Sequence, residues 1–447
     1  MGAKPKRTVE KETLLLNGLR DLLGAFPALQ SSAFRQWWAG YIVSISGKQM
    51  LWITEGWLIY ELSGSKLLLG ANSLAQAVPA TALALLGGAL ADRLDQRRLL
   101  IVTQTIDMLV LCILAAFCFF QRVEVWHVIL ASFLHSCLSV FEQPARQSLF
   151  PHLVDRAAMP SAVGLNATVH PGTRVFSPVV TGFILAGVMG ATSSAMLAAG
   201  AVFAITAAGL AVYTLVLCFL EVPPIARVRR GNMLSNTVEG MRFVWTNRIY
   251  ASLLSVVYVN MLFGLAMHVL FPVVAKDVLG MGPEALGMMY TAQGIGSLIG
   301  AVIAARWMAA RDQGKWTVIG SLVLGGSTVL FGLSQWYPVT LAVLWIAGVG
   351  SSIFSVASQS SLQLMVPDEF RGRVMSLWAM THSSVRPVGE MQFALVAALT
   401  TASFALAAGG LAVIAFILLA VLPNRSLRAL NVTQAYAPRT EGGGHGS

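Results

Sequence analysis

Charged side chains inside long apolar runs are the residues best placed to do chemistry in this sequence. Lys48 and Glu55 lie in the run 37–60, and Asp107 lies in the run 99–120. A charge at the centre of a membrane span costs at least about 2.5 kcal/mol, so each should face a partner or a water-filled cavity. Lys48 and Glu55 are two helical turns apart and therefore share roughly one face of a helix.

Two interpretations of this pair are open. Glu55 could bind a proton or another cation and release it when a solute arrives, which makes it the leading coupling candidate. Alternatively, Lys48 and Glu55 are only structural, pairing with each other through water or with other helices. Asp107 is a further coupling candidate, although it could simply make polar contacts with Gln104 and neighbouring helices.

A second pair of charges, Arg386 and Glu390, lies four residues apart on one face of the run 374–399. The arginine could bind an anionic group through two hydrogen bonds, or hold Glu390 ionised until the solute competes. A salt bridge that locks the helix is the alternative. Glu390 is thus also a coupling candidate. The candidates for lining a solute cavity are Lys48, Trp52, Tyr258, Tyr290, Gln293 and Arg386.

The composition requires that membrane helices position these residues. Of the 447 residues, 56% are hydrophobic and only 11% are charged, whereas a soluble domain carries about 25% charged residues. A bilayer core of ~30 Å needs about 20 apolar residues per helix. We predict an all-α polytopic membrane protein with twelve transmembrane helices in two pseudo-symmetric six-helix bundles. The expected spans are 37–60, 67–91, 99–120, 126–141, 162–188, 194–220, 250–275, 285–307, 316–333, 339–364, 374–399 and 404–422.

These spans divide the chain into five parts. The first is a cytoplasmic N-terminal segment, 1–36, in which leucines at helical spacing predict either an amphipathic surface helix or a frayed tail. Two bundles, which we call the first half (37–221) and the second half (249–422), flank a cytoplasmic linker, 222–248. The cytoplasmic tail, 423–447, ends in GGGHGS, which is typical of an expression scar.

The basic residues support this topology. Lysines and arginines are frequent in every second loop and at both ends of the chain, whereas the opposite loops carry only Lys66, Arg122 and Lys276. Basic loops stay in the cytoplasm, so we expect a multi-pass protein of the cytoplasmic (inner) membrane with both termini inside. The net charge of +10 then reflects contact with membrane lipids rather than nucleic acid. The four cysteines and the histidines lack metal-ligand spacing, and we expect no metal and no cofactor.

Several segments resemble a known family. The loop 87–100, GGALADRLDQRRLL, resembles the signature loop of the major facilitator superfamily. The segments FEQPARQSLFPHLV, NATVHPGTRVFSPVVTG and VPDEFRGRVMSL are similar to the multidrug and siderophore (enterobactin-type) exporter branch. One departure is that Ser177 precedes Pro178, where these exporters usually have glycine, which weakens the inference to antiport.

This resemblance implies roles for two further sets of residues. A cytoplasmic gate would close when the two halves meet on the inner side. Its members would be Gly88, Asp92, Arg93, Arg97, Glu142, Arg146, Arg371 and Arg373. A kinked, closely packed fifth span would couple the halves through Gly172, Arg174, Pro178 and Gly182.

These observations favour a secondary active transporter, because the sequence lacks the GxxxxGK[ST] motif of ATP-driven proteins. We expect a monomeric, proton-coupled exporter of an amphipathic small organic compound (a drug, siderophore or lipid-like solute) that works by alternating access. A facilitator or importer without proton coupling is the alternative. A non-transporting receptor, a scaffold or a membrane enzyme is a further reading, but no convergent nucleophile, acid and base occur, so we do not expect an enzyme.

Overall fold

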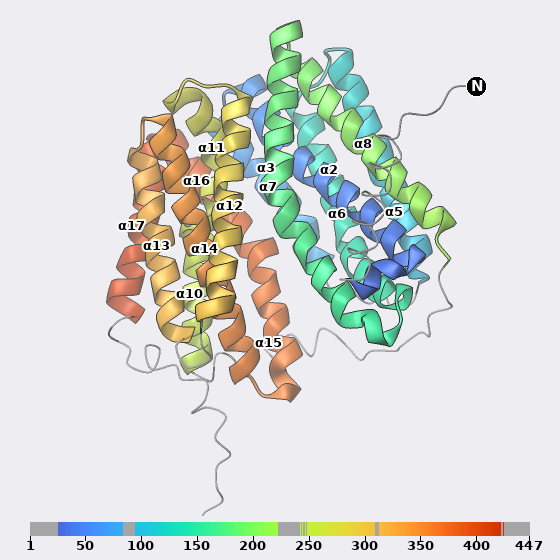
Figure 1. Cartoon of the computed structure of the whole chain (residues 1–447). Coiled ribbons are helices and arrows are strands. Elements are labelled where there is room, and N and C mark those ends of the chain that lie inside the picture. The colour runs from blue at the N-terminus through green and yellow to red at the C-terminus, as the bar shows by residue number, and fades with distance from the viewer. Residues whose placement is uncertain are drawn as a thin grey trace, which may run out of the picture.

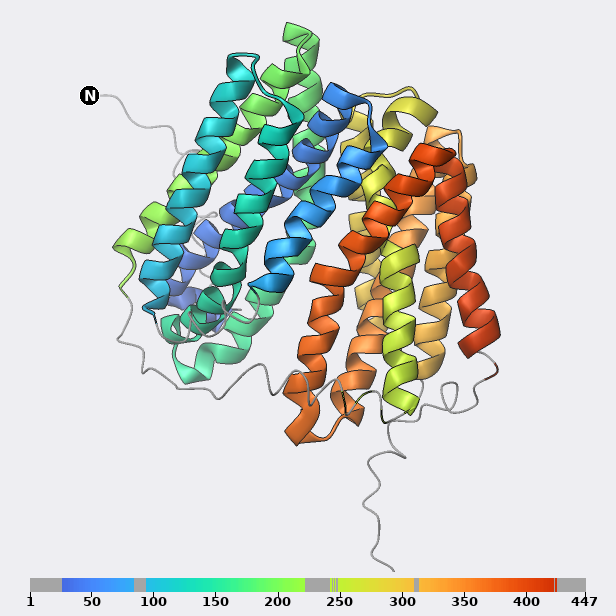
Figure 2. The same ribbon diagram turned by 180° about the vertical axis from the view of Figure 1, so that it is seen from behind.

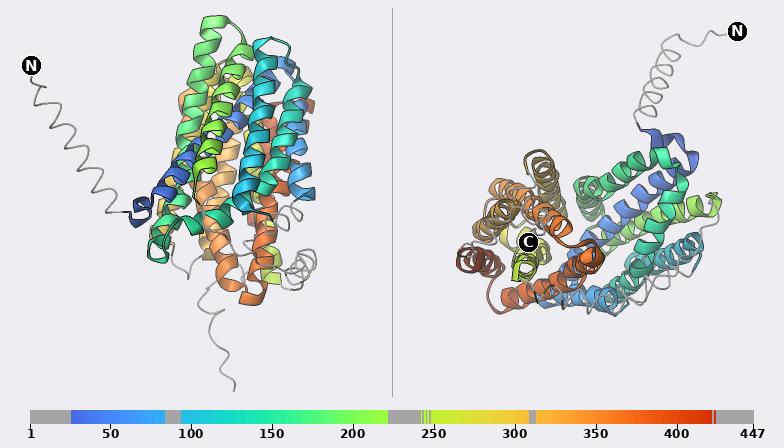
Figure 3. Two further views of the ribbon diagram at one scale, coloured as in Figure 1. Left: turned by 90° about the vertical axis from the view of Figure 1, so that its right-hand side faces the viewer. Right: turned by 90° about the horizontal axis from the view of Figure 1, so that it is seen from below.

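The computed structural model describes residues 26–83, 94–221, 242, 244, 246, 248–308, 313–421 and 423. All regular structure within these residues is helical. Figures 1 and 2 show two groups of long helices side by side, one from each half of the chain, and Figure 3 shows the same division from below. The expected surface helix in 1–36, most of the linker and nearly all of the tail lie outside the described residues.

The first half contains six long helices. Local signals set their ends: the Ser31 hydroxyl accepts a hydrogen bond from the backbone N–H of Phe34 at the start of α2, and Gly64 ends that helix with φ +60°. Asp95 caps α5 in the same way. The helices are α2 (Ser32–Ser63), α3 (Lys66–Ala82), α5 (Gln96–Phe119), α6 (Val125–Leu149), α7 (Met159–Thr192) and α8 (Ala195–Phe219), with short 3-10 turns η1 (Pro27–Gln30), η2 (Phe150–Leu153) and η3 (Arg156–Ala158).

The second half has more interrupted helices. Its first span changes from α to 3-10 geometry after Gly264, and a π-turn precedes Arg386 and Pro387 in a later span, as expected where proline removes a backbone donor. The elements are α10 (Arg248–Phe263), η4 (Leu265–Leu270), α11 (Phe271–Val273), η5 (Val274–Val278), α12 (Pro283–Trp307), α13 (Gln313–Leu333), α14 (Tyr337–Met365), α15 (Asp368–Met380), η7 (Thr381–Val385), α16 (Arg386–Leu399), α17 (Ala402–Phe416) and η8 (Ile417–Val421).

Nine helical segments within the described residues are long and apolar enough to cross a membrane. Many large apolar side chains lie on the outside of these helices; Phe120, Phe219 and Leu399, for example, are 76%, 79% and 77% exposed. Such a surface suits lipid and not water. The other three expected spans overlap with α2, with α3, which covers 67–82 of the expected 67–91, and with the segment formed by α15, η7 and α16, and the total of twelve stays a prediction.

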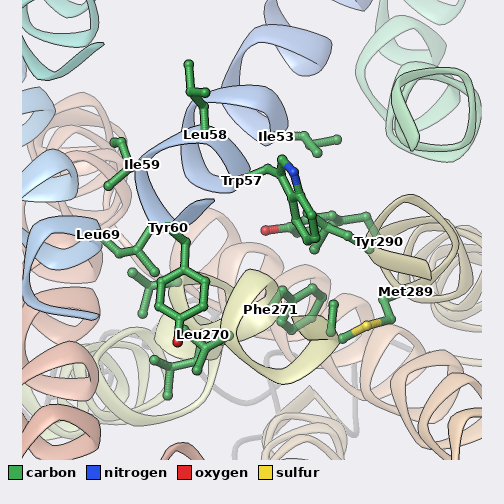
Figure 4. Close-up of a cluster of buried hydrophobic side chains, with 14 of the residues drawn as sticks. Ile53, Trp57, Leu58, Ile59, Tyr60, Leu69, Leu270, Phe271, Met289 and Tyr290 are labelled. Atoms are coloured by element: carbon green, nitrogen blue, oxygen red, sulfur yellow. The ribbon is translucent and has the colours of Figure 1, made fainter. Parts of the chain in front are cut away.

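The buried apolar residues form three clusters. One cluster lies within the first half and includes Trp37 and Tyr213, and another lies within the second half and includes Leu253 and Phe354. The third combines residues of both halves: Trp57 and Tyr60 of α2 lie near Phe271, Met289 and Tyr290 of the second half (Figure 4). Among the described residues, the apolar core shared by the two halves therefore lies towards one end of the helices.

Two helix crossings join the halves: α7 packs on α12, and α3 packs on α16. Glycine allows both. A Cβ atom at Gly287 would lie 3.0 Å from the Cα of Gly182, and one at Gly70 would lie 2.7 Å from the sulfur of Met391. Side chains there would push the helices apart. In Figures 1 and 2 the two groups of helices come together towards the top and diverge towards the bottom.

Candidate functional site

The first half contains a buried network of charged side chains from three helices. The Lys48 ammonium of α2 lies 2.5 Å from Glu142 Oε2 of α6 and 3.3 Å from Asp107 Oδ2 of α5. The Nδ1 atom of His135 lies 2.9 Å from Asp107 Oδ1. The side chains of Asp107 and Glu142 are 0% and 1% exposed, so each carboxylate depends on these partners for compensation.

In this network Lys48 contacts carboxylates of other helices and not that of Glu55. Seven residues at about 1.5 Å rise separate two side chains by ~10 Å along the helix, too far for direct contact, whereas α5 and α6 bring carboxylates against Lys48. Glu55 is 3% exposed, and among the described residues its Oε1 atom has no hydrogen-bond partner. A buried carboxylate with an oxygen atom left without a hydrogen-bond donor is unfavourable, while the neutral acid costs less. Glu55 is therefore suited to exchanging a proton.

A second group of polar and aromatic side chains lies where the halves meet. Trp52 of α2 makes edge-to-face contacts with Tyr290 of α12 and His268 of η4, at centroid distances of 5.2 and 6.3 Å. The guanidinium carbon of Arg386 lies 5.7 Å from the centre of the Trp52 ring. A cation over an indole ring is favourable, most of all away from water. Trp52 thus connects the first half to three elements of the second. We call Trp52, Tyr290, His268 and Arg386 the junction cluster.

Polar contacts hold the junction cluster in place. The Nε of Arg386 donates to Glu390 Oε1 at 2.8 Å, the pairing that the four-residue spacing predicts. The Nδ1 of His268 donates to the carbonyl oxygen of Leu265, and its Nε2 lies 2.6 Å from the side-chain amide of Gln293. The sequence-predicted Trp52, Tyr290, Gln293, Arg386 and Glu390 are therefore neighbours.

Tyr258, another cavity candidate, lies elsewhere. It packs on the apolar cluster inside the second half. A tyrosine in a span has too many apolar surfaces available for its type alone to place it in a cavity.

The α7 residues fall into two groups. Gly182 and Pro178 lie at the contact with α12: a Cβ at Gly182 would strike the α12 backbone, and a Cβ at Gly287 of α12 would strike the Pro178 carbonyl oxygen. A Cβ at Gly172, in contrast, would meet no atom within 4 Å. Arg174 is exposed and has no hydrogen-bond or ion-pair partner among the described residues. Its backbone nevertheless lies against α12, because a Cβ at Gly294 would be 2.7 Å from the Arg174 carbonyl oxygen.

The predicted cytoplasmic gate is only partly visible. Gly88, Asp92 and Arg93 lie outside the described residues, so pairing with Asp92 stays a prediction. The described members make contacts within their own halves. In the first half, Arg97 donates to the carbonyl oxygens of Leu217 and Cys218, and Glu142 binds Lys48. The guanidinium carbon of Arg146 lies 4.7 Å from the Tyr41 ring centre. In the second half, Arg371 donates to the Gln363 carbonyl oxygen, and the guanidinium carbon of Arg373 lies 5.3 Å from the Phe370 ring centre.

Charged side chains join the halves at the opposite end of the helices, which we call the lysine end after Lys66 and Lys276. The other end is the arginine end, where the hydroxyl oxygens of Thr81 and Ser384 lie 2.7 Å apart across the halves. Lys276 Nζ lies 2.8 Å from Glu61 Oε2. The hydroxyl of Tyr60 donates to Asp277, and Lys66 donates to the Ala397 carbonyl oxygen at 3.1 Å. Sequence reasoning missed these pairs, although isolated charges at span ends in basic-poor loops were a signal for them.

The comparisons with known proteins agree with this architecture. A family model described as a transmembrane secretion effector matches residues 23–439. The chain belongs to this family, within the major facilitator superfamily. Its members and structural neighbours are transporters and not enzymes. In the residues described, no three His, Cys, Asp or Glu side chains converge to hold a metal ion.

Similar curated proteins are exporters. Macrolide efflux protein A of Streptococcus pyogenes is 23% identical over 365 residues, which is 80% of this chain and 88% of that protein. The enterobactin exporter EntS of an Escherichia coli strain is 26% identical over 276 residues, 60% of this chain and 64% of that protein. The resemblance to this exporter branch is thereby confirmed.

Solved structures confirm the transporter fold. The nucleoside transporter NupG superposes with a TM-score of 0.66 at 13% identity, covering 87% of this chain and 98% of that one. A bacterial homologue of the lysosomal transporter Spinster, in an inward-facing and unoccupied conformation, also gives 0.66, at 14% identity and 91% and 96% coverage. The protein is therefore a multi-pass membrane transporter for a small-molecule solute.

Proposed function

We propose that this protein is a proton-coupled exporter of amphipathic organic compounds that works by alternating access between two six-helix halves, 37–221 and 249–422, as a monomer in the cytoplasmic membrane. The observation that carries the proposal is the buried carboxyl group of Glu55, whose Oε1 atom has no hydrogen-bond partner among the described residues and which lies on the same helix as Trp52 of the junction cluster. A proton site and a solute site on one helix can act on each other through its movement.

The distribution of the core supports alternating access. The halves share buried apolar residues and polar contacts at the lysine end, and each has its own core towards the arginine end. By the charge distribution the arginine end is cytoplasmic. This arrangement is the one expected of a transporter closed to the outside, ready to take up solute from the cytoplasm. Opening the lysine end would then release the solute.

The charged network supports coupling. A proton arriving from outside at Glu55, or at the pair of Asp107 and His135, changes the charge in a membrane region where charge is costly. The contacts of Lys48 with Asp107 and Glu142 span three helices, so a change there alters how α2 packs on α5 and α6. Glu390, which is bound to Arg386, is the second coupling candidate, and the solute would compete for that arginine.

The solute class follows from the junction cluster. Aromatic surfaces of Trp52 and Tyr290 beside the charged Arg386 suit a compound with an apolar body and a polar group. The two exporters named above carry different solutes by name, a macrolide and enterobactin, so they support export without specifying one compound.

The test is transport in liposomes with an imposed pH gradient, using a panel of amphipathic dyes. Glu55→Gln should remove gradient-driven accumulation and leave gradient-independent exchange of dye, because the solute site is intact but cannot exchange a proton. Asp155→Asn, an exposed carboxylate outside the long helices, is the matched control and should transport normally. Glu390→Gln distinguishes the second coupling site from the first.

Two results would contradict the proposal. Flux that ignores the pH gradient in the unaltered protein would favour the facilitator or importer. Gradient-driven flux that survives both Glu55→Gln and Glu390→Gln would remove these carboxylates from coupling.

A further inference from the structure

Arg174 of α7 has surroundings that differ from the sequence prediction. The family motif assigns it to helix packing and coupling. Among the described residues, however, no side chain or carbonyl oxygen accepts a hydrogen bond from its guanidinium group, and the residue is exposed. An arginine in a membrane span without a partner is costly unless water or a ligand solvates it.

The exposed surface of Arg174 faces the interior of the protein and not the lipid. On α7 it shares a face with Ser177, Pro178 and Thr181, which are buried. Phe176 and Phe183, 72% and 62% exposed, lie on the opposite face. With 3.6 residues per turn, positions 174 and 183 are about half a turn apart around the axis. Arg174 therefore borders a space between helices that water can enter.

That space adjoins the junction cluster. The hydroxyl of Thr291 on α12 donates to the carbonyl oxygen of Val175 at 3.0 Å, one residue from Arg174 and one from Tyr290. The charges of Arg174 and Arg386 act on each other and on the imidazole of His268. The three side chains, from α7, η4 and α16, thus form one electrostatic neighbourhood.

The charge balance of this neighbourhood is positive. It contains two guanidinium groups, those of Arg174 and Arg386, and one carboxylate, Glu390, which is bound to Arg386, so one formal positive charge remains. Glu390 binds only the Nε of Arg386, so the terminal nitrogens of Arg386 have no partner among the described residues. Guanidinium groups with free donors match the geometry of carboxylate, sulfonate and phosphate groups.

From this geometry we propose that Arg174 and Arg386 form an anion subsite between the two halves, which binds the acidic group of an organic anion while Trp52 and Tyr290 contact its aromatic or apolar body. This inference deepens the proposed function by naming its solute class. Because Arg174 belongs to the first half and Arg386 to the second, a bound anion would bridge them. Its binding would favour the arrangement in which both arginines reach it.

Equilibrium binding to the purified full chain in detergent tests this subsite, with fluorescein as the anionic probe and a rhodamine methyl ester as a cationic probe with the same ring system. We expect saturable fluorescein binding, and Arg174→Gln should raise its Kd about tenfold or more because charge-assisted hydrogen bonds are lost. Arg174→Lys, which retains the charge without the fork of donors, should give an intermediate Kd. The rhodamine ester should bind Arg174→Gln at least as tightly as the unaltered chain.

Two controls keep the result interpretable. Arg122→Gln removes an exposed arginine at the lysine end and should leave the fluorescein Kd unchanged. If Arg174→Gln fails to fold, Arg386→Gln combined with Glu390→Gln removes the second guanidinium without leaving its carboxylate unpaired, and should also weaken fluorescein severalfold.

Absence of saturable fluorescein binding, an unchanged Kd in the folded Arg174 or Arg386 variants, or an equal loss of rhodamine ester binding would overturn the subsite. These measurements need no pH gradient. A chain that binds the anion but shows no gradient-driven flux would refute proton coupling and leave the subsite standing, so the two proposals fail separately.

Discussion

The first-half network depends on one residue, Lys48, which compensates two buried carboxylates at once. Asp107 also has His135 as a partner, but the contact of Glu142 Oε2 is with Lys48, and its Oε1 has no partner in the described part of the chain. Removing one member of a buried ion pair leaves an uncompensated charge, which typically costs about 3 to 5 kcal/mol.

Lys48→Met is accordingly expected to lower the free energy of unfolding by about 3 kcal/mol or more. Adding Glu142→Gln should recover much of this loss, because the stranded charge is then removed as well. Thermal or denaturant unfolding in detergent would measure both. Lys66→Met, whose ammonium donates to a backbone carbonyl at the lysine end, is the control. A Lys48→Met protein as stable as the parent would show that the network is not needed for stability.

At the scale of elements, α7 is the helix on which the contact between the halves depends. It contains Pro171 and Pro178 yet continues for 34 residues, and it meets α12 along a line where Gly182 faces Gly287. Backbone contacts at this distance leave no room for a side chain, while Gly172 on the same helix has open space beside it. The two glycines therefore offer a matched pair of substitutions.

Gly182→Leu should separate α7 from α12, because its Cβ would lie 2.8 Å from the Pro283 carbonyl oxygen and 3.1 Å from the Gly287 Cα, and backbone atoms cannot move aside. The lysine end would then close poorly. In a cysteine-free background, a reporter cysteine at Tyr60 should react with a maleimide severalfold faster in Gly182→Leu than in Gly172→Leu. Equal rates in the two variants would mean that this crossing does not hold the lysine end closed.

At the scale of the whole molecule, the lysine end holds the two halves together in this conformation. An ion pair between Glu61 and Lys276, partly exposed at 25% and 39%, contributes little energy by itself. It acts together with the hydrogen bond of Tyr60 to Asp277 and with the apolar residues that both halves bury there. A transport cycle that exposes the solute site to the other side must break all of these contacts.

Cross-linking tests this directly. With cysteines at Glu61 and Lys276 in an otherwise cysteine-free chain, a short bis-methanethiosulfonate reagent should abolish transport, since the lysine end can no longer open. A reductant, which cleaves the link, should restore the flux. Each single-cysteine variant treated with the same reagent is the control, and full flux in the cross-linked double variant would contradict alternating access at this end.

Much of the architecture was determined by the sequence alone. The sequence specifies a helical membrane transporter of the major facilitator type through its apolar runs of bilayer length, its unevenly distributed arginines, and the motifs around 87–100 and 142–182. These features can be recognised in the sequence because the length of an apolar run and the charge of a loop depend only on nearby residues. The pairing of Arg386 with Glu390 was also predictable, since four residues on a helix bring two side chains together whatever surrounds them.

Contacts between helices were decided only by the tertiary structure. Lys48 binds Asp107 and Glu142, 59 and 94 positions along the chain, instead of Glu55 on its own helix, and Tyr258 packs within one half while Trp52 reaches across to Tyr290 and His268. A charged residue within an apolar run indicates that its side chain has a partner, because an unpaired charge in the membrane is unfavourable. Which partner it finds depends on the rotation, tilt and crossing of whole helices, and these follow from the packing of many side chains at once.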